Sequence, residues 1–321
     1  MGGIRVMRTV FRGESISYGY DKHQLILKDV SITIPDQSIY GIIGPAGSGK
    51  TTLAQVMLGL ERSSVGKLTW FNERINASTN RRVGYVPYKK SLLYDLTVYE
   101  NVLLFGRLYK YSGKRLKQQV EQALQFVGLW EDRRSRASSL TAKEQQLLNI
   151  ACGIVHLPDV VIFDEPTKDI EQDMREVILK SIRQLHELGV TIVYLSQNAD
   201  EIEELCTHVG IMQQGNFIAQ GKIDELLEQH HQYCALVRLQ LAESATKLQA
   251  ELGEYNICDV EAQAMVVEVN ANGEQEIQRI KSILGDKLLQ MDVVNPKLKL
   301  MYSCLMNRSG LSRYASQPTI H

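Results

Sequence analysis

The chain has 321 residues, of which 44% are hydrophobic, and its formal net charge is −1. This length accommodates two domains with buried cores. The balanced charge gives no support to nucleic-acid binding, which usually goes with a basic surplus, so we expect no nucleic-acid partner. No apolar run approaches the ~18 residues of a membrane span, and residues 1–13 lack the apolar core of a signal peptide. If the protein acts at a membrane, another chain must supply the pore.

The cysteines and histidines form no recognisable metal or disulfide pattern. The number of cysteines is odd and no pair has C-x-x-C spacing, so we expect reduced, mostly buried thiols of a cytosolic protein. They are Cys152, Cys206, Cys234, Cys258 and Cys304. The neighbours His230 and His231 have no acid or Cys at metal-ligand spacing. We interpret these two histidines as part of an exposed helix end.

The N-terminal part of the chain has the pattern of an α/β domain. Residues 25–34 are strand-like and end at a Pro-Asp turn signal. Residues 38–43 are a short apolar strand followed at once by a glycine-rich turn, and residues 51–60 are apolar enough for a packed helix. Strand, turn and helix therefore follow one another directly.

Two further apolar runs indicate strands that are buried on both faces. Residues 160–163 and 190–195 are continuously apolar, and residues 175–188 between them carry one apolar helical face. Strand, helix and strand in this order predict a parallel sheet with crossover helices. The predicted fold class is therefore α/β, with a mostly parallel sheet.

The remaining segments complete a two-domain prediction. We assign residues 1–230 to the α/β domain, which includes a helical subdomain at about residues 88–142 and closes with a hairpin near residues 209–219. Residues 231–306 alternate short strands with two helical stretches, which predicts a small C-terminal α+β domain. Residues 307–321 are polar, and we expect this tail to be disordered.

The strongest motif lies between the predicted strand and helix near residue 50. It reads Gly44-Pro45-Ala46-Gly47-Ser48-Gly49-Lys50-Thr51, followed by Thr52. This is the P-loop pattern G-x-x-x-x-G-K-[ST]. Its glycines let backbone N–H groups turn inward around a phosphate chain, at the positive end of the following helix. Lys50 would lie against the β- and γ-phosphates, and the Thr51 hydroxyl would ligate Mg²⁺.

A second motif supplies the acidic half of the site. Asp164 and Glu165 follow the buried strand at residues 160–163, and ligands bind at the C-terminal ends of such strands. Asp164 would hold Mg²⁺, directly or through water, and Glu165 would act as general base toward a water molecule. The sequence thus predicts a Mg-ATP site.

These two motifs together resemble the ATP-binding cassette family of transporter ATPases, over roughly residues 12–227. The resemblance implies that Tyr20 stacks on adenine, with Tyr18 as the alternative. It also places Tyr88 where the family has the glutamine of its Q-loop.

Three further positions depart from the family pattern. Thr141, Ala142, Lys143 and Glu144 stand where the family signature reads S-G-G-Q, a segment that binds the γ-phosphate held by the opposite subunit. Lys168 begins a segment that differs from the usual D-loop, and Gln197 replaces the catalytic histidine. Because a glutamine amide carries neither charge nor a transferable proton, we expect weak sensing of the γ-phosphate.

The resemblance implies an ATP-binding subunit of a transporter at the cytoplasmic face of the cell membrane. A separate permease would supply the pore, and a second cassette, identical or different, would complete each ATP site. The altered positions predict slow hydrolysis. The C-terminal domain is similar to that of export-type ATPases, so we expect export rather than import.

Other functions remain open at this stage. The chain would be a regulatory partner if it bound ATP without hydrolysing it. Soluble cassette ATPases of DNA repair or translation usually carry two cassettes or long coiled coils, which this sequence lacks. A P-loop kinase is disfavoured by the acidic run that begins at Asp164 and by the remnant of the signature segment.

Overall fold

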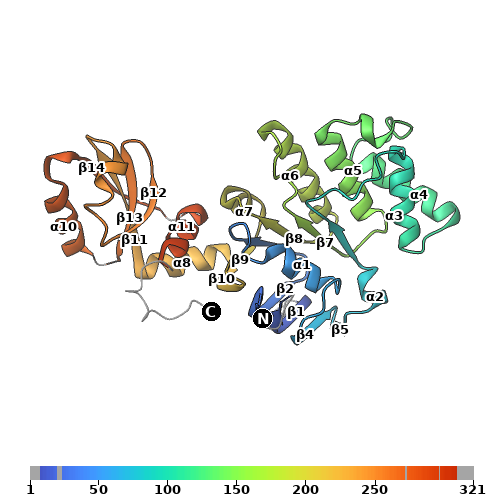
Figure 1. The fold of residues 1–321 in the computed structure, drawn as a ribbon, viewed down its shortest axis with the longest axis horizontal. Coiled ribbons are helices and arrows are strands. Elements are labelled where there is room, and N and C mark those ends of the chain that lie inside the picture. The colour runs from blue at the N-terminus through green and yellow to red at the C-terminus, as the bar shows by residue number, and fades with distance from the viewer. Residues whose placement is uncertain (1–7, 20–23, 272, 296, 309–321) are drawn as a thin grey trace, which may run out of the picture. The chain divides into compact units, whose positions relative to one another are not determined.

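The computed structural model describes residues 8–19, 24–271, 273–295 and 297–308. The chain forms two compact units, Met1–Phe217 and Ile218–His321 (Figure 1). The boundary that the sequence predicts, after residue 230, falls inside the continuous helix α8 (Ile223–Tyr233). Since one hydrogen-bonded helix acts as a single element, α8 belongs entirely to the second unit. Among the described residues, no helix has both the length and the apolar character needed to cross a bilayer.

The first unit contains most of a six-stranded sheet in the order β10-β9-β3-β8-β7-β6, and the unit boundary falls within β10. The strands are β3 (Ile39–Ile43), β6 (Val83–Val86), β7 (Val160–Asp164), β8 (Thr191–Ser196), β9 (His208–Gln213) and β10 (Asn216–Lys222). The five strands from β9 to β6 pair in parallel. Every residue of β3, β7 and β8 is buried, which explains their unbroken apolar sequences. The predicted parallel sheet is confirmed.

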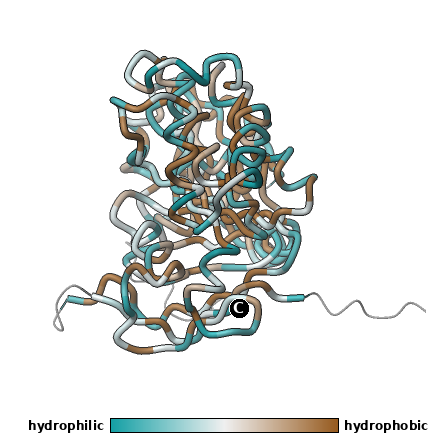
Figure 2. The backbone as a smooth tube through the Cα atoms, turned by 90° about the vertical axis from the view of Figure 1, so that its right-hand side faces the viewer, coloured by the Kyte–Doolittle hydropathy of each residue, from teal (hydrophilic) through white to brown (hydrophobic). Residues whose placement is uncertain are grey.

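Helices pack against this sheet and connect its strands. They are α1 (Lys50–Met57), α6 (Gln172–Glu187) and α7 (Ala199–Leu205). Hydrophobic segments gather in the interior of the unit, and hydrophilic ones run mostly along its outside (Figure 2). Parallel strands bring their C-terminal ends to one edge of the sheet, so the segments after β3, β6, β7 and β8 lie near one another.

A second, antiparallel sheet supports α1. Its order is β2-β1-β4-β5, with β1 (Thr9–Tyr18), β2 (Leu27–Pro35), β4 (Val65–Trp70) and β5 (Glu73–Arg74), and the short helix α2 (Ala77–Asn80) follows. Trp70 is fully buried, and its ring lies 4.5 Å from that of Phe11 between centroids. The Trp70 Nε1–H donates to the Met57 carbonyl at 2.7 Å. This bond fixes the C-terminal end of α1 to the sheet.

The predicted helical subdomain is present but extends further than expected. It contains α3 (Val98–Leu108), α4 (Gly113–Phe126), the 3₁₀ turn η1 (Ala137–Ser139) and α5 (Ala142–Ile154), and the three α-helices lie together in Figure 1. Helix α5 contacts α3, α4 and β6. A Cβ on Gly84 of β6 would collide with the Gly153 carbonyl oxygen of α5. This close backbone contact couples α5 to the strand that leads to Tyr88.

The second unit is a four-stranded antiparallel sheet in the order β12-β13-β11-β14, covered by helices. Its elements are β11 (Cys234–Leu241), α9 (Ala245–Leu248), β12 (Asn256–Val260), β13 (Ala264–Asn270), α10 (Glu274–Leu284), η2 (Gly285–Lys287), β14 (Leu288–Val294) and α11 (Leu298–Arg308). Alternate residues pack in two clusters. Val237 and Val267 join Ile280 of α10, whereas Leu236 and Val266 join Cys304 of α11. The two helices therefore cover opposite faces of the sheet.

Some sequence expectations for this unit are wrong. The first of the two predicted helical stretches forms only the four-residue helix α9, and the sequence does not predict α11. Helix α11 includes Asn307 and Arg308, which were assigned to the disordered tail. The rest of that tail, residues 309–321, lies outside the described residues.

The expected free cysteines and exposed histidine pair also need correction. Cys258 and Cys304 form a disulfide between β12 and α11, with their Cα atoms 4.7 Å apart. The other three cysteines are buried thiols, as expected. His231 is exposed, but His230 is only 2% exposed. A sequence separation of 46 residues between the paired cysteines leaves no local pattern from which the bridge can be predicted.

We expect the substitution Gly84→Ala to lower the free energy of unfolding of the first unit by about 1–3 kcal/mol, because the added methyl group must push β6 and α5 apart. Chemical denaturation followed by fluorescence would measure the loss. Gln122→Ala, on the exposed face of α4, is the control and should stay within about 0.5 kcal/mol of the parent. Equal stability of Gly84→Ala and the parent would contradict the close contact.

Candidate functional site

The P-loop occupies residues 44–49, between β3 and α1, as predicted. Gly47 and Gly49 have φ angles of +77° and +105°, which residues with a Cβ rarely adopt. A Cβ on Gly44 would collide with the Met212 carbonyl oxygen of β9. The Ser48 Oγ is buried and has no hydrogen-bond partner among the described residues. A buried polar atom without a partner in a glycine-rich loop fits a site that receives a polar ligand.

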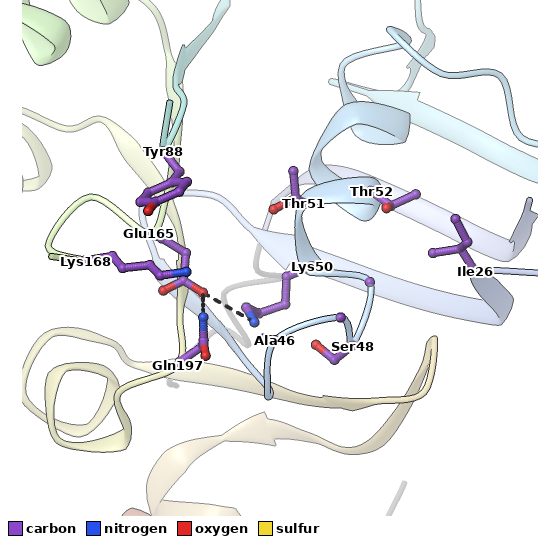
Figure 3. Close-up of a pocket in the computed structure, with 12 residues that line it drawn as sticks. Ile26, Ala46, Ser48, Lys50, Thr51, Thr52, Tyr88, Glu165, Lys168 and Gln197 are labelled. Carbon is purple, nitrogen blue, oxygen red and sulfur yellow. Dashed lines mark hydrogen bonds and ion pairs between the residues drawn. The ribbon is translucent and has the colours of Figure 1, made fainter. Parts of the chain in front are cut away.

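Lys50 begins α1 and is 5% exposed. Its Nζ donates to the carbonyl oxygens of Gly44 at 2.7 Å and Pro45 at 3.1 Å. It also lies 3.4 Å from the Glu165 Oε1, a contact drawn in Figure 3. Burial lowers the pKa of the Lys50 ammonium, and the Glu165 carboxylate opposes this shift. A cation held this way is preorganised for an anionic ligand.

Thr51 and Asp164 form the predicted magnesium position. The Thr51 hydroxyl donates to the Asp164 Oδ1 at 3.1 Å, and the Tyr85 hydroxyl donates to the Oδ2 at 3.2 Å. Asp164 is 1% exposed, and burial raises the pKa of its carboxyl group, against the hydrogen bonds from Thr51 and Tyr85. A hydroxyl and a carboxylate in hydrogen-bond contact are oxygen ligands of the kind that Mg²⁺ prefers. These residues therefore fit the ion, and Tyr85 is a contributor that sequence reasoning missed.

Glu165 and Gln197 meet at the ends of β7 and β8. The Gln197 Nε2 donates to the Glu165 Oε1 at 3.0 Å (Figure 3). Glu165 has a φ angle of +50°, an uncommon conformation for a residue with a side chain, and such strain is typical of functional sites. The structure thus brings Gln197 into direct contact with Glu165.

A buried carboxylate holds the backbone behind these two residues. The Glu201 Oε2 of α7 accepts hydrogen bonds from Thr167 at 2.8 Å, Tyr194 at 2.9 Å and Ser196 at 3.0 Å. Thr167 follows Glu165 closely, and Ser196 precedes Gln197 directly. The network therefore joins the segments after β7 and β8 to one helix.

Tyr88 projects into the same pocket from the segment after β6. Its hydroxyl donates to the Asp169 Oδ2 at 2.6 Å, and this hydrogen bond raises the pKa of the Tyr88 phenol. The Lys168 Nζ lies 4.7 Å from the centroid of its ring. An aromatic side chain with a cation beside its ring thus stands where the family pattern has an amide.

These residues surround a cavity of about 380 Å³. Its lining consists of Ile26, Ala46, Gly47, Ser48, Gly49, Lys50, Thr51, Thr52, Tyr88, Glu165, Lys168 and Gln197. Ile26 and Lys168 were not predicted. Ile26 is seen beyond Thr52 and away from Glu165 (Figure 3), and only its position before a strand could have indicated it. Gly44, Pro45 and Asp164 are not among the lining residues.

The expected adenine-stacking residue cannot be placed. Tyr20 lies outside the described residues. The alternative, Tyr18, is wrong for this role because it is 5% exposed within the core and its hydroxyl donates to the Glu61 Oε2 at 2.7 Å.

The segment that replaces the family signature caps its own helix. Thr141 is the N-cap of α5, and its backbone N–H and its hydroxyl both donate to the Glu144 Oε2 at 2.8 Å. The Glu144 N–H donates back to the Thr141 Oγ1 at 3.3 Å. These bonds form a capping box, and they lower the pKa of the Glu144 carboxyl group. Ala142 and Lys143 occupy the first turn of the helix, and none of the four residues lines the cavity.

Known proteins resemble this chain over most of its length. The linearmycin resistance ATP-binding protein LnrL of Bacillus subtilis (strain 168) is 26% identical over 309 residues, which is 94% of this chain and 99% of LnrL. The Nod factor export ATP-binding protein I of Bradyrhizobium diazoefficiens is 31% identical over 64% of this chain and 69% of its own. The model of the ABC transporter family matches residues 27–168.

The chain belongs to the ABC transporter family. Solved structures of the family agree in fold. The structure of an ATP-binding subunit of an ABC transporter superposes with a TM-score of 0.62 at 22% identity, covering 69% of this chain and 93% of its own. The dimeric ATP-binding cassette MJ0796 bound to ADP and Pi superposes with a TM-score of 0.60 at 22% identity, covering 66% and 98%. As an ABC protein, the chain is an ATP-binding subunit of a transporter.

We expect Asp164→Asn to stabilise the nucleotide-free protein at neutral pH. Because the folded-state pKa of Asp164 is raised, its contribution to stability is present below the unfolded-state pKa and is lost as pH rises through the folded-state pKa. An asparagine side chain does not ionise, so the variant does not lose this stability as the pH rises. Melting temperatures of the two proteins should therefore differ at pH 7 and converge at acidic pH, while Mg-ATP should stabilise only the parent. A lower melting temperature of the variant at pH 7 would contradict this account.

Proposed function

We propose that the cavity binds Mg-ATP and that the protein hydrolyses it slowly to drive export through a separate permease. The observation that carries the binding proposal is the contact of Thr51 with Asp164 beside a buried Lys50. Lys50 and the P-loop amides would hold the β- and γ-phosphates, while Thr51 and Asp164 would hold Mg²⁺. The ion would neutralise phosphate charge.

Glu165 is the proposed general base. It would accept a proton from the water molecule that attacks the γ-phosphorus, giving ADP and phosphate. Its Oε1 already contacts Lys50 at 3.4 Å and Gln197 at 3.0 Å. Gln197 can orient the carboxylate and donate to a phosphate oxygen, but it cannot carry the charge of a protonated histidine.

The capping box supports the proposal of slow hydrolysis. In the family, the corresponding helix end binds the γ-phosphate of the facing subunit through backbone N–H groups and a serine. Here the Glu144 carboxylate accepts the bonds of Thr141 and carries a negative charge at the same helix end. A second anion at that place would meet like-charge repulsion and a helix end whose Thr141 donors and Glu144 N–H are already used.

The chain combines a complete set of phosphate and Mg²⁺ residues with an altered signature segment. This combination favours pairing with a different cassette. In a homodimer, both ATP sites would face a capping box. In a heterodimer with a regular partner, the site with Glu165 would face a good signature, and the partner's site would face Glu144. The alternative function, a non-hydrolysing regulatory partner, rests on the same altered residues, and turnover by the assembled transporter distinguishes the two.

A permease would bind at the helical subdomain, at the cytoplasmic face of the membrane. The segment from Tyr88 to Gly106 leaves Leu93 and Tyr94 exposed at 49% and 44%. A cleft of about 300 Å³ lies next to it, lined by Thr97, Tyr99, Glu100, Trp130, Arg133 and Arg134. Exposed apolar side chains beside a cleft are typical of a protein-binding surface. Similarity over the full length of LnrL and to Nod factor export proteins favours export as the direction.

A matched pair of variants tests binding and hydrolysis. Lys50→Ala should weaken the binding of Mg-ATP by at least about 100-fold, since it removes a buried charge from the phosphates. Glu165→Gln should bind Mg-ATP as the parent does and lose turnover in the assembled transporter. Fluorescent-nucleotide titration and phosphate release measure the two effects. Unchanged turnover of Glu165→Gln alongside a clear parental rate would refute its role as general base.

Restoring the signature should accelerate hydrolysis. In the assembled transporter, the combined change Ala142→Gly, Lys143→Gly and Glu144→Gln should raise ATP turnover by at least about tenfold, because it frees helix-end donors and removes a negative charge. Glu187→Gln, which removes one negative charge at the exposed end of α6, is the control and should leave turnover unchanged. A rate that does not rise in the triple variant would show that the capping box does not limit hydrolysis.

A further inference from the structure

The second unit contains a buried group of side chains that the nucleotide site does not use. His230 of α8, Glu268 of β13 and Cys304 of α11 are all buried, and their ligand atoms lie within 4.8 Å of one another. Cys258 of β12 adds a second sulfur, bonded to Cys304. Three ligand atoms thus converge from α8, β13 and α11, and the disulfide brings the Cys258 sulfur of β12 next to one of them.

His230 is the observation that points to a ligand. Its side chain is 1% exposed, and neither ring nitrogen has a hydrogen-bond partner among the described residues. The Nε2 lies 3.3 Å from the Glu268 Oε1, but without hydrogen-bond geometry. A buried imidazole normally has its nitrogens satisfied, and one left open beside a carboxylate and a sulfur has the environment of a metal ligand.

Glu268 is oriented by a neighbour, as metal-bound carboxylates usually are. The Asn256 Nδ2 donates to the Glu268 Oε2 at 2.5 Å and to the Cys304 carbonyl at 3.0 Å. One amide therefore positions two of the candidate ligands. Leu236 and Val266 surround the sulfur atoms with apolar groups, which strengthens charge–charge attraction at this place.

We propose that the reduced form of this group is a Zn²⁺ site with His230, Glu268, Cys258 and Cys304 as ligands, and that the disulfide is its oxidised, metal-free form. Tetrahedral zinc with bonds of 2.0–2.3 Å places its ligand atoms about 3.3–3.8 Å apart. The ligand atoms of His230, Glu268 and Cys304 already lie within 4.8 Å of one another and need only small side-chain shifts. The two sulfurs must separate, which follows from breaking their bond.

The chemistry balances with a dithiol reductant as the electron donor. The reductant supplies two electrons and two protons, which convert the Cys258–Cys304 disulfide to two thiols, and is itself oxidised to a disulfide. The thiols then release two protons as their sulfurs bind Zn²⁺. Either state ties α11 to β12, by a covalent bond or through the ion. This site is independent of the proposed function of the nucleotide cavity.

Zinc uptake by the full-length protein tests the proposal. Protein reduced with a dithiol, stripped with a chelator and equilibrated with Zn²⁺ should retain one ion per chain after buffer exchange, as measured by mass spectrometry of the metal. The oxidised protein should retain none. With Co²⁺, the reduced protein should show sulfur-to-metal charge-transfer absorption, which distinguishes this site from magnesium-type oxygen ligands at the P-loop.

Variants assign the ligands. Cys258→Ser and His230→Gln should each weaken zinc binding by at least about tenfold. Their matched controls, Cys234→Ser and His231→Gln, change the same residue types in the same unit and should bind as the parent does. Circular dichroism would confirm that each variant folds. Failure of the reduced parent to retain zinc, or equal retention by His230→Gln, would overturn the proposal, and neither result would affect ATP binding at Lys50.

Discussion

The nucleotide site of the first unit is organised by a buried attraction between Lys50 at the start of α1 and Glu165 at the end of β7. Burial alone works against both signs of charge, lowering the pKa of Lys50 and raising that of Asp164. The P-loop carbonyls, Glu165 and Thr51 offset that cost with specific contacts. A site built this way is preorganised, because its charges are in place before a ligand arrives. The parallel sheet brings the ends of β3, β7 and β8 to the same edge, where these residues meet.

The part of this arrangement that could be predicted is the part encoded locally. A strand, a glycine-rich turn and a helix follow one another without interruption around Lys50, and an apolar strand runs directly into Asp164 and Glu165. Such patterns fix both the element and the residue at its end. By contrast, Tyr85 and Lys168 reach the site only through the pairing of distant strands and a turn. Lys168 lies in the segment that departs from the family pattern after Glu165, whereas nothing near Tyr85 in the sequence marks its role.

The second unit shows more clearly that residues assembled only by tertiary structure cannot be predicted from local sequence patterns. Its strands and α10 follow from alternation and helical periodicity, whereas α11 lacks a strong apolar face and was missed. The bridge between Cys258 and Cys304, and the burial of His230, depend on α8 and α11 covering one face of the sheet. Local spacing rules for metal or disulfide sites cannot detect residues that only a tertiary arrangement assembles.

The signature segment illustrates a conflict between two demands on one helix end. A serine or threonine followed three residues later by an acid is an efficient way to begin a helix, and α3 and α5 both use it. In α5, however, the capping box uses the N–H and hydroxyl donors of Thr141, which a nucleotide on a facing subunit would need. Stability of the isolated chain and recognition across an interface therefore compete for the same atoms at Thr141 and Glu144.

The hydrogen bonds to Glu201 have a mechanical consequence. Thr167, Tyr194 and Ser196 share one carboxylate oxygen, so the loops that carry Glu165 and Gln197 are clamped to a single anchor and must shift as one piece. Tyr88 arrives from a different direction, on the segment that leads into the helical subdomain, and touches this piece through Asp169. A displacement of that subdomain would therefore reach Glu165 and Gln197 through the hydrogen bond between Tyr88 and Asp169. Tyr88 would thus couple the helical subdomain to the nucleotide site.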